Sequence, residues 1–238
     1  MPQTLALVQF RQSLRAPRAL LAIERRRFHD PPRPNEVPAV EGLRGGAAVL
    51  MVGAFEAFLK AFCPEALTPL SDARTIDFAL LPSEMQETSV FGTLDTAMTT
   101  RVAPNDRKFD RLPSITKAAN FVASGSLNPA VFGDTQSNPG KKTVERIGKT
   151  LGFSNIFAAS RTRFESTWGS AVSGTFIEDT LEAIVNRRHG VAHTASALNI
   201  SRLDLQVADR FLTVFATTLD IVVRQHISQS KSRARFRS

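Results

Sequence analysis

Apolar and polar residues follow each other with the spacing of an α-helix along most of this chain. Residues 4–28 carry apolar side chains at helical intervals, and we expect Pro17 to break or kink that stretch. A proline-rich connector at residues 30–38 is expected not to be helical. Residues 41–62 are apolar on nearly every side and precede Pro64, so the pattern predicts a central, buried helix that ends there.

The helical pattern continues through the rest of the chain. We expect Ser83 to cap the next helix, with Gln86 completing a capping box. Pro113 is expected to interrupt a later helix, and Gly152 to end a short one. The predicted helices are 83–100, 106–123, 141–151, 159–168, 175–188 and 201–228, and the predicted loops are 65–82 and 124–140.

No segment shows the strict alternation of a β-strand, and tyrosine, which favours strands, is absent. Proline and glycine lie between the predicted helices and form no long linker. The sequence therefore predicts an all-α protein. We expect one kinked helical bundle over residues 1–230, followed by a basic tail at residues 231–238.

The composition indicates the size of the core and the cellular compartment of the protein. Hydrophobic residues make up 42% of the 238 residues, enough for a substantial core. A single cysteine, Cys63, cannot form an internal disulfide, which fits a reducing cytoplasm. The chain does not begin like a secretory signal, and its most apolar run, residues 45–55, is about half of the ~20 residues that a membrane span needs. We therefore expect a cytoplasmic protein without a membrane partner.

The net charge of +8 is concentrated at the two ends. Residues 1–34 carry seven arginines against Glu24 and Asp30, and residues 231–238 carry four basic residues and no acidic one, so the remainder is close to neutral. Basic ends suit an anionic partner such as RNA, because lysine and arginine displace condensed counterions from phosphates. A solvated helix face and a frayed tail explain the same pattern, and both interpretations stay open.

Two arginines and two histidines lie together in residues 186–193, which read Asn-Arg-Arg-His-Gly-Val-Ala-His. An arginine five positions before a histidine, as in Arg188 and His193, is expected roughly 0.4 times by chance in this composition. The spacing alone is therefore weak, but its place between two predicted core helices adds weight. On an unbroken helix the two side chains would lie ~140° apart. Either the helix breaks near Gly190, or the arginine reaches round, or a second subunit completes the site.

Three stretches together resemble HEPN domains, and in particular the prokaryotic branch related to RNase L-type (RiboL-PSP-like) domains. The first is residues 181–194, where a helix runs into Arg, a polar residue, three residues and His. The second is the buried helix of residues 45–60, with its apolar-Glu-Ala-aromatic-Leu ending. The third is Asn138-Pro139 followed by a short helix and Gly152-Phe153. The three landmarks stand in the family's order and cover most of the chain.

The resemblance implies a kinked helical bundle that dimerises so that two motifs face one groove, and cleavage of RNA without a metal or another cofactor. Histidine titrates near neutral pH and arginine offers a planar fork of donors to phosphate. On this basis His193 is the expected acid/base and Arg188 the phosphate clamp. His189, at the family's polar position, would orient the phosphate or supply a second proton-transfer group, and Arg187 and Asn186 would be supporting contacts.

The alternatives are a HEPN domain that binds RNA or a nucleotide without cleaving it, and a purely structural cluster that caps a helix dipole. Some HEPN toxins carry a tyrosine two residues after the motif histidine, which a partner enzyme modifies. Ala195 stands there in this chain, which disfavours that mode of control. The resemblance leaves open a defence or toxin role, with an antitoxin or sensor protein as partner.

Glu56 lies on the most apolar predicted helix, where an ionised carboxylate is costly without a partner. It either pairs with Arg187 or Arg188 and supports the site, or faces water at the edge of the core. The remaining candidates favour structural roles. These are the core residues Met51, Phe55, Phe58 and Phe62, the packing pair Phe164 and Trp168, and the solvated pair Lys141 and Lys142. His29 and His226 have no cluster around them, and no spacing suggests a metal site.

Overall fold

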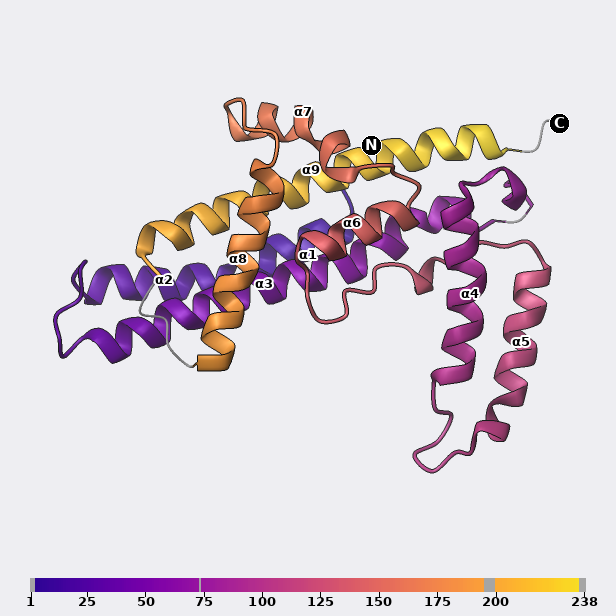
Figure 1. Ribbon diagram of the computed structural model, residues 1–238, viewed down its shortest axis with the longest axis horizontal. Coiled ribbons are helices and arrows are strands. Elements are labelled where there is room, and N and C mark those ends of the chain that lie inside the picture. The colour runs from indigo at the N-terminus through magenta and orange to yellow at the C-terminus, as the bar shows by residue number, and fades with distance from the viewer. Residues whose placement is uncertain (1–2, 73, 195–199, 236–238) are drawn as a thin grey trace.

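The computed structural model describes residues 3–72, 74–194 and 200–235, and for residues 192–194 it describes the backbone alone. Over these ranges the chain is helical and forms no β-strand, which confirms the all-α prediction (Figure 1). The helices are α1 (Leu5–Ser13), α2 (Arg15–Arg27), α3 (Val37–Leu67), α4 (Ser83–Thr99), α5 (Leu112–Ala123), α6 (Lys141–Thr150), α7 (Ile156–Trp168), α8 (Phe176–Thr194) and α9 (Arg202–Ala234), with short 3-10 turns at 68–70, 78–80, 108–111 and 129–131.

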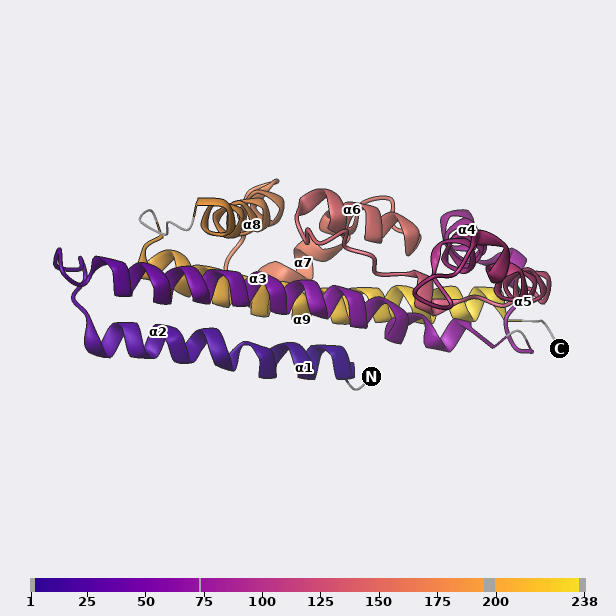
Figure 2. The same cartoon turned by 90° about the horizontal axis from the view of Figure 1, so that it is seen from below.

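The two long helices α3 and α9 run side by side and form the central layer of the molecule (Figure 2). On one side, α1 and α2 follow each other along the length of α3. On the other side, α8 crosses α3, and α6, α4 and α5 follow further along the layer (Figures 1 and 2). The motif helix α8 and the arginine-rich helix α2 therefore lie on opposite sides of α3.

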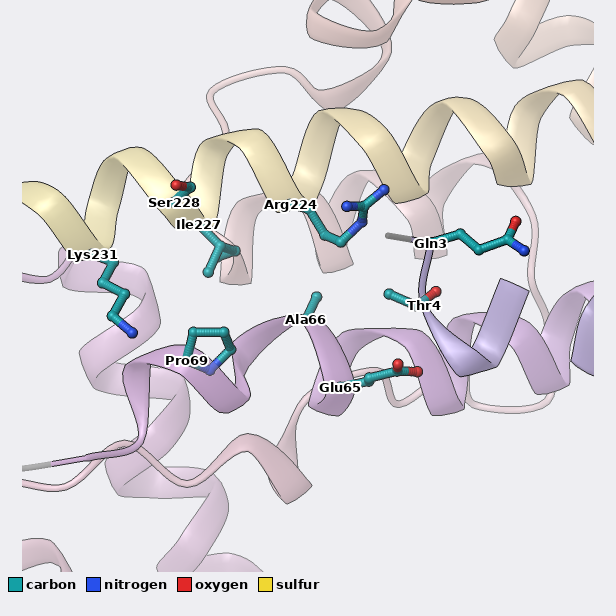
Figure 3. A pocket seen from close by; sticks show the side chains of 9 residues that line it. All are labelled: Gln3, Thr4, Glu65, Ala66, Pro69, Arg224, Ile227, Ser228 and Lys231. Atoms are coloured by element: carbon teal, nitrogen blue, oxygen red, sulfur yellow. The ribbon is translucent and has the colours of Figure 1, made fainter. Parts of the chain in front are cut away.

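The start of the chain is tied to the far end of the central layer by side chains from both long helices. Glu65 of α3 accepts hydrogen bonds from the backbone nitrogens of Leu5 and Ala6, at 2.7 and 2.9 Å. Thr4 donates its hydroxyl to Asp220 of α9 at 2.5 Å. A cavity of about 390 Å³ opens beside these contacts, between α3, α9 and the first residues (Figure 3). Free N–H groups at a helix start favour such carboxylate partners.

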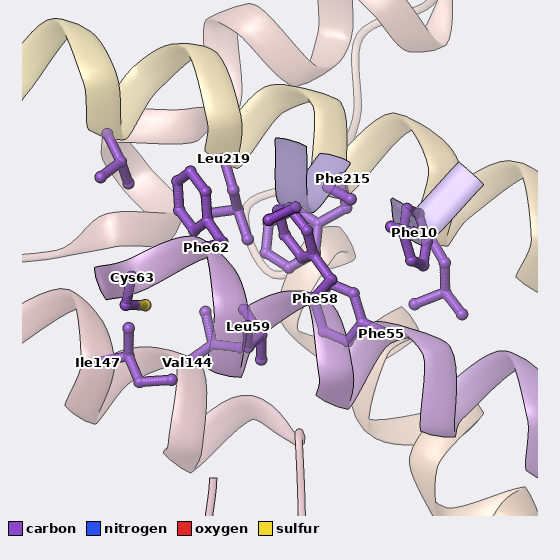
Figure 4. Close-up of a cluster of buried hydrophobic side chains, with 14 of the residues drawn as sticks. Phe10, Phe55, Phe58, Leu59, Phe62, Cys63, Val144, Ile147, Phe215 and Leu219 are labelled. Atoms are coloured by element: carbon purple, nitrogen blue, oxygen red, sulfur yellow. The ribbon is translucent and has the colours of Figure 1, made fainter. Parts of the chain in front are cut away.

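A row of phenylalanines fills the centre of the core between α1, α3 and α9 (Figure 4). The ring centroids of Phe55 and Phe215 lie 5.9 Å apart, and those of Phe58 and Phe62 lie 5.0 Å apart. Burying each such ring is worth about 1.5–3 kcal/mol. The prediction that Phe55, Phe58 and Phe62 belong to the core, together with Met51, is confirmed, since none is more than 2% exposed.

Helix α3 is longer at both ends than the sequence pattern predicts. It begins at Val37, so the end of the expected non-helical connector is helical, because Pro38 occupies the first turn, where its missing N–H costs nothing. It also continues through Pro64 to Leu67, whose side chain is fully buried. The segment Val37–Leu70 is long and apolar enough to cross a membrane, but 56% of its most apolar window is buried inside the fold, as in a core helix.

Three other boundaries differ from the prediction. The break in the first predicted helix falls at Leu14 and not at Pro17, because the proline ring conflicts with the carbonyl four residues before it. Ser83 is the first residue of α4 and not its cap, and Gln86 donates to the carbonyls of Ala79 and Leu81. Helix α9 continues to Ala234, so the first residues of the expected basic tail are helical.

A buried group of opposite charges fixes α2, α3 and the start of α9 relative to one another. Glu24 is fully buried and accepts hydrogen bonds from Arg44 at 2.6 Å and from Arg202 at 2.8 Å. Arg44 also contacts Asp30 at 3.1 Å and donates to the carbonyl of Ile200 at 3.3 Å. This network holds the residues that immediately precede α9, and therefore constrains the chain just beyond the motif.

We expect Glu24→Ala to lower the free energy of unfolding by about 3–5 kcal/mol, because it leaves Arg44 buried without its carboxylate partner. Urea denaturation followed by circular dichroism measures this loss. Glu87→Ala, at an exposed position of α4, should change stability by less than about 0.5 kcal/mol. A loss below about 1 kcal/mol in the Glu24 variant would contradict a stabilising network.

Candidate functional site

The motif lies on the C-terminal half of α8, which is a continuous helix from Phe176 to Thr194. The helix does not break at Gly190, so the first of the three arrangements considered above is wrong. Val191 packs against the core one residue later, and that contact offsets the ~1 kcal/mol cost of a helical glycine. On this unbroken helix the backbone positions 188 and 193 lie about 140° apart around the helix axis.

Arg188 points toward α3 and the loop of residues 133–140. Its Nη2 donates to the carbonyl oxygen of Ser137 at 3.1 Å and lies 3.7 Å from Glu56 Oε2. The side chain is 18% exposed, so the guanidinium is held but still reaches the surface. Of the two arrangements expected for Glu56, the structure has the one in which this carboxylate pairs with an arginine of the motif.

Glu56 joins α3, the 133–140 loop and α8 through its two oxygens. Oε1 accepts from Lys60 Nζ at 2.7 Å and from Thr135 Oγ1 at 2.9 Å, while Oε2 faces Arg188. Burial alone would raise the pKa of this carboxyl, but the hydrogen bonds from Lys60 and Thr135 and the charges of Lys60 and Arg188 lower it below its ordinary value. Glu56 is therefore ionised at neutral pH and holds the guanidinium electrostatically.

The 133–140 loop contributes contacts that the sequence did not predict. Gly133, at φ +87°, lies so close to the α3 backbone that a Cβ atom would come within 2.9 Å of the Leu59 carbonyl oxygen. Gln136 and Ser137 both have positive φ, which costs energy for residues with a side chain. This backbone turns the Ser137 carbonyl toward Arg188, and the contact adds a neutral acceptor beside the carboxylate.

Arg187 and Glu182 connect the same helix to its other neighbours. Arg187 Nη2 lies 2.8 Å from Oδ1 of Asp204, whose other oxygen accepts from Ser201 in the capping box of α9. Glu182 Oε2 accepts from the backbone nitrogen of Lys141 at 3.2 Å, at the start of α6. These contacts fix α8 against α9 and α6. The expected supporting role of Arg187 is therefore, in geometric terms, a role in positioning α8.

The remaining motif positions lie on other sides of α8, about 100–160° from Arg188 around the helix axis. Asn186 is exposed and His189 is half-buried. At 100° per residue, Asn186, His189 and His193 lie within about 60° of one another on the helix. The backbone of His193 belongs to α8, and its side chain lies outside the described part of the structure. One helix thus directs its arginine toward its own chain and presents the histidine positions on another face.

A polar cavity of about 500 Å³ is lined in part by Lys60, the residue that also contacts Glu56 Oε1. Lys60 reaches it from α3 and Arg146 from α6, and Asp95 of α4 and Asp134 of the loop supply negative charge. Arg146 also donates to the carbonyl of Asp134. Cationic groups therefore continue beyond the motif, from Arg188 past Glu56 to Lys60 and Arg146.

The basic residues of α2 and of the described part of the C-terminal end, up to residue 235, do not lie at this site. The arginines of α2 are on the opposite side of α3 from α8 (Figure 2). The cavity beside Arg224 and Lys231 lies toward the other end of α9 (Figures 1 and 3). Any contact between the ends and RNA would therefore be remote from the motif.

The other candidate residues make packing or ion-pair contacts with their own chain. Trp168 packs on Phe164 and Phe176 and lies 4.3 Å from the guanidinium of Arg210, so its ring is not offered to a base. His29 contacts Glu36 at 2.8 Å, and His226 stacks on a neighbouring ring. Among the residues that the structure describes, no group of three or more His, Cys, Asp or Glu side chains is placed to hold a metal ion.

A comparison with protein-family models matches residues 22–225 to the model described as RiboL-PSP-HEPN. The chain belongs to the RiboL-PSP-HEPN family. The match includes α3 with Glu56, the 133–140 loop and the whole of α8, so all the contacts of Arg188 described above lie inside the HEPN domain. Comparisons with curated proteins and with solved structures found no match. HEPN membership indicates an RNase or a nucleotide-related module.

We expect Glu56→Gln to reduce stability near neutral pH by about 1 kcal/mol, because a neutral amide no longer attracts Lys60 and Arg188. The folded pKa of Glu56 is lowered from its ordinary 4.5, so its ionised form stabilises the fold above pH 4.5, and this stabilisation is lost as the pH falls through the lowered pKa. The difference between wild type and variant in urea denaturation should therefore shrink below pH 4.5. A difference that is constant with pH, or that Glu87→Gln reproduces, would argue against this role.

Proposed function

We propose that this HEPN protein is a metal-independent endoribonuclease whose site is shared between two copies of the chain. The observation that carries the proposal is that Arg188 and the two histidine positions of the motif lie on different faces of α8. Arg188 is held at the surface by Glu56 and Ser137, whereas the positions of His189 and His193 lie on a different face of the same helix. A reaction that needs both groups at one phosphate is therefore best served by α8 helices from two subunits that face each other.

The proposed reaction is transfer of an RNA 2′-hydroxyl onto the adjacent phosphorus. The nucleophile loses its proton to a base, the P–O5′ bond breaks, and the departing 5′-oxygen gains a proton, which leaves a 2′,3′-cyclic phosphate. His193 is the proposed acid/base, and His189 of the other copy the second proton-transfer group. Arg188 stabilises the negative charge on the phosphoryl oxygens, and its five donors exceed those used by Glu56 and Ser137.

The surroundings of Arg188 support an extended polyanion as substrate. Lys60 and Arg146 line the polar cavity beyond Glu56, and the start of α6 adds Lys141 and Lys142. A strand that reaches Arg188 can place neighbouring phosphates along these side chains. A toxin or defence role in the cytoplasm, controlled by an antitoxin or sensor protein, belongs to the same proposal and follows from the kind of activity.

A second candidate is a HEPN module that binds RNA or a nucleotide without cleaving it. The observation that favours it is that both motif arginines already face carboxylates of their own chain, Glu56 and Asp204. Such pairing reduces the positive charge available to a transition state. Binding that occurs without any cleavage, and that weakens steeply with salt, would support this module in place of the enzyme.

In the presence of EDTA we expect the wild-type protein to cleave single-stranded RNA and to leave 2′,3′-cyclic phosphate ends. His193→Ala and Arg188→Ala should each lower the rate by at least ~100-fold, because they remove the proton-transfer group and the phosphate clamp. His29→Ala removes a histidine on the other side of the molecule and serves as the matched control. Equal cleavage by all four proteins would show that a contaminant is responsible and would reject the proposal.

The shared site makes a separate prediction about mixtures. When Arg188→Ala and His193→Ala are unfolded together and refolded in equal amounts, about half of the dimers are mixed, and each mixed dimer has one complete site. About a quarter of wild-type activity should return, although each variant alone is inactive. If the mixture stays inactive while mass spectrometry shows that mixed dimers formed, the two groups act within one chain and the shared arrangement is wrong.

A further inference from the structure

The hairpin of α4 and α5, residues 83–123, projects from the three-layer body (Figure 1) and is called the arm below. Its surface is unusually apolar. Phe91, Phe109 and Phe121 are 67%, 79% and 37% exposed, and Met98 and Val102 are about as exposed. Large apolar side chains gathered on one element, in contrast to single ones scattered over a surface, mark an interaction site.

Helix α5 shows the same property in its sequence. It reads Leu-Pro-Ser-Ile-Thr-Lys-Ala-Ala-Asn-Phe-Val-Ala, with a single charge at Lys117, yet Ala118 is its one buried residue. A helix this apolar is normally covered on more than one side. The groove between α5 and α4 is also partly open, with a cavity of about 430 Å³ that Phe121 helps to line. At its base α4 also packs on α6 and on the turn at residues 129–131. Beyond that base, two helices alone leave the arm under-packed, and a further helical surface would complete it.

The charges of the arm are divided along its length. Helix α4 contains Glu84, Glu87 and Asp95 and no basic residue, a net charge of −3. The part from 100 to 117 has a net charge of +3 from five basic and two acidic residues. The three acidic residues of α4 lie within about 40° of the line through Phe91 and Met98 on the helix. The apolar stripe of α4 is thus bordered by negative charge, whereas the tip, residues 100–111, is positive.

We propose that the arm binds the arm of a second copy of this chain in antiparallel orientation. A two-fold axis places the positive tip of each arm, which carries Phe109, against α4 of the other arm. The apolar stripe of α4 that it meets consists of Phe91 and Met98 and is bordered by acidic residues. Because the arrangement is isologous, each favourable pairing of opposite charges occurs twice. Two arms that each carried one sign of charge would repel each other. This arm carries a negative α4 and a positive tip, so a second copy in antiparallel orientation offers the complementary charges. Helix α4 extends ~25 Å, long enough for two such contacts.

This surface is distinct from the motif face of α8, and association through it does not depend on RNA cleavage. Four helices, two from each copy, would enclose the apolar side chains that are now exposed, as in a small helical bundle. The interface is modest in area, so we expect reversible association that depends on protein concentration and ionic strength.

The test uses the full chain and two charge-reversed variants in sedimentation velocity over a range of concentrations. Arg107→Glu with Lys108→Glu changes the net charge of the tip, residues 100–111, from positive to negative, and Glu84→Lys with Glu87→Lys removes the acidic base of the arm. All four positions are exposed, so folding should be retained, and circular dichroism checks this. Ile23→Glu, at an exposed apolar position of α2, is the matched control for a new charge on the surface.

Association through the arm is a separate step from the α8 dimer proposed above. We expect the wild type and Ile23→Glu to show the same association steps, and each charge-reversed variant to raise the Kd of one step by about tenfold or more. An equal mixture of the two variants should associate again, because the acidic arm then meets the basic one. Phe91→Glu should weaken association without being rescued by either variant. Association steps that are all unchanged in the arm variants, or a mixture that does not regain the weakened step, would overturn this proposal alone. A wild type that is monomeric at every concentration would overturn it together with the α8 dimer.

Discussion

The constraint on which the rest of the structure depends is that α3 is apolar around nearly its whole circumference. A helix with one apolar stripe needs one partner, but this one is covered by several, and Val49 and Leu50 lie on the one side that stays exposed. Helices α1 and α2 cover one side, α9 lies alongside, and α8 crosses the other side. The layered architecture follows from that requirement. So does the position of the motif, because α8 is one of the helices needed to bury α3.

Apolar burial alone does not decide which helix covers which side, and the few polar residues of α3 supply that information. Arg44 meets Glu24 of α2, Glu65 meets the first nitrogens of α1, and Glu56 meets Arg188 of α8. Along α3, Glu56 and Glu65 lie about 180° apart at 100° per residue, which matches the opposite sides on which α8 and α1 lie. An unpaired charge at any of these places would be costly, so a wrong arrangement of the layers is disfavoured.

The sequence was sufficient for the helical class, the central helix and the carboxylate on it, because these depend on local spacing and on the cost of burying a charge. The sequence was less informative about features that depend on residues far apart in the chain, such as the end of α3 and the contacts of the 133–140 loop. Pro64 did not end α3, since tertiary burial of the following turn outweighs one missing hydrogen bond. Thr135 and Ser137 are polar residues in a loop, and nothing local shows that they lie against Glu56 and Arg188.

The interior pairing of Arg188 also bears on how a HEPN motif can be both stable and reactive. The guanidinium of Arg188 is anchored by its own chain, through an ionised carboxylate and a carbonyl held by strained backbone. Positions 189 and 193 lie about 100° and 140° further round the same helix. Folding therefore fixes the part of the motif that needs a defined direction. In the endoribonuclease proposed above, the histidine positions would meet Arg188 of a second copy, and assembly would complete the site.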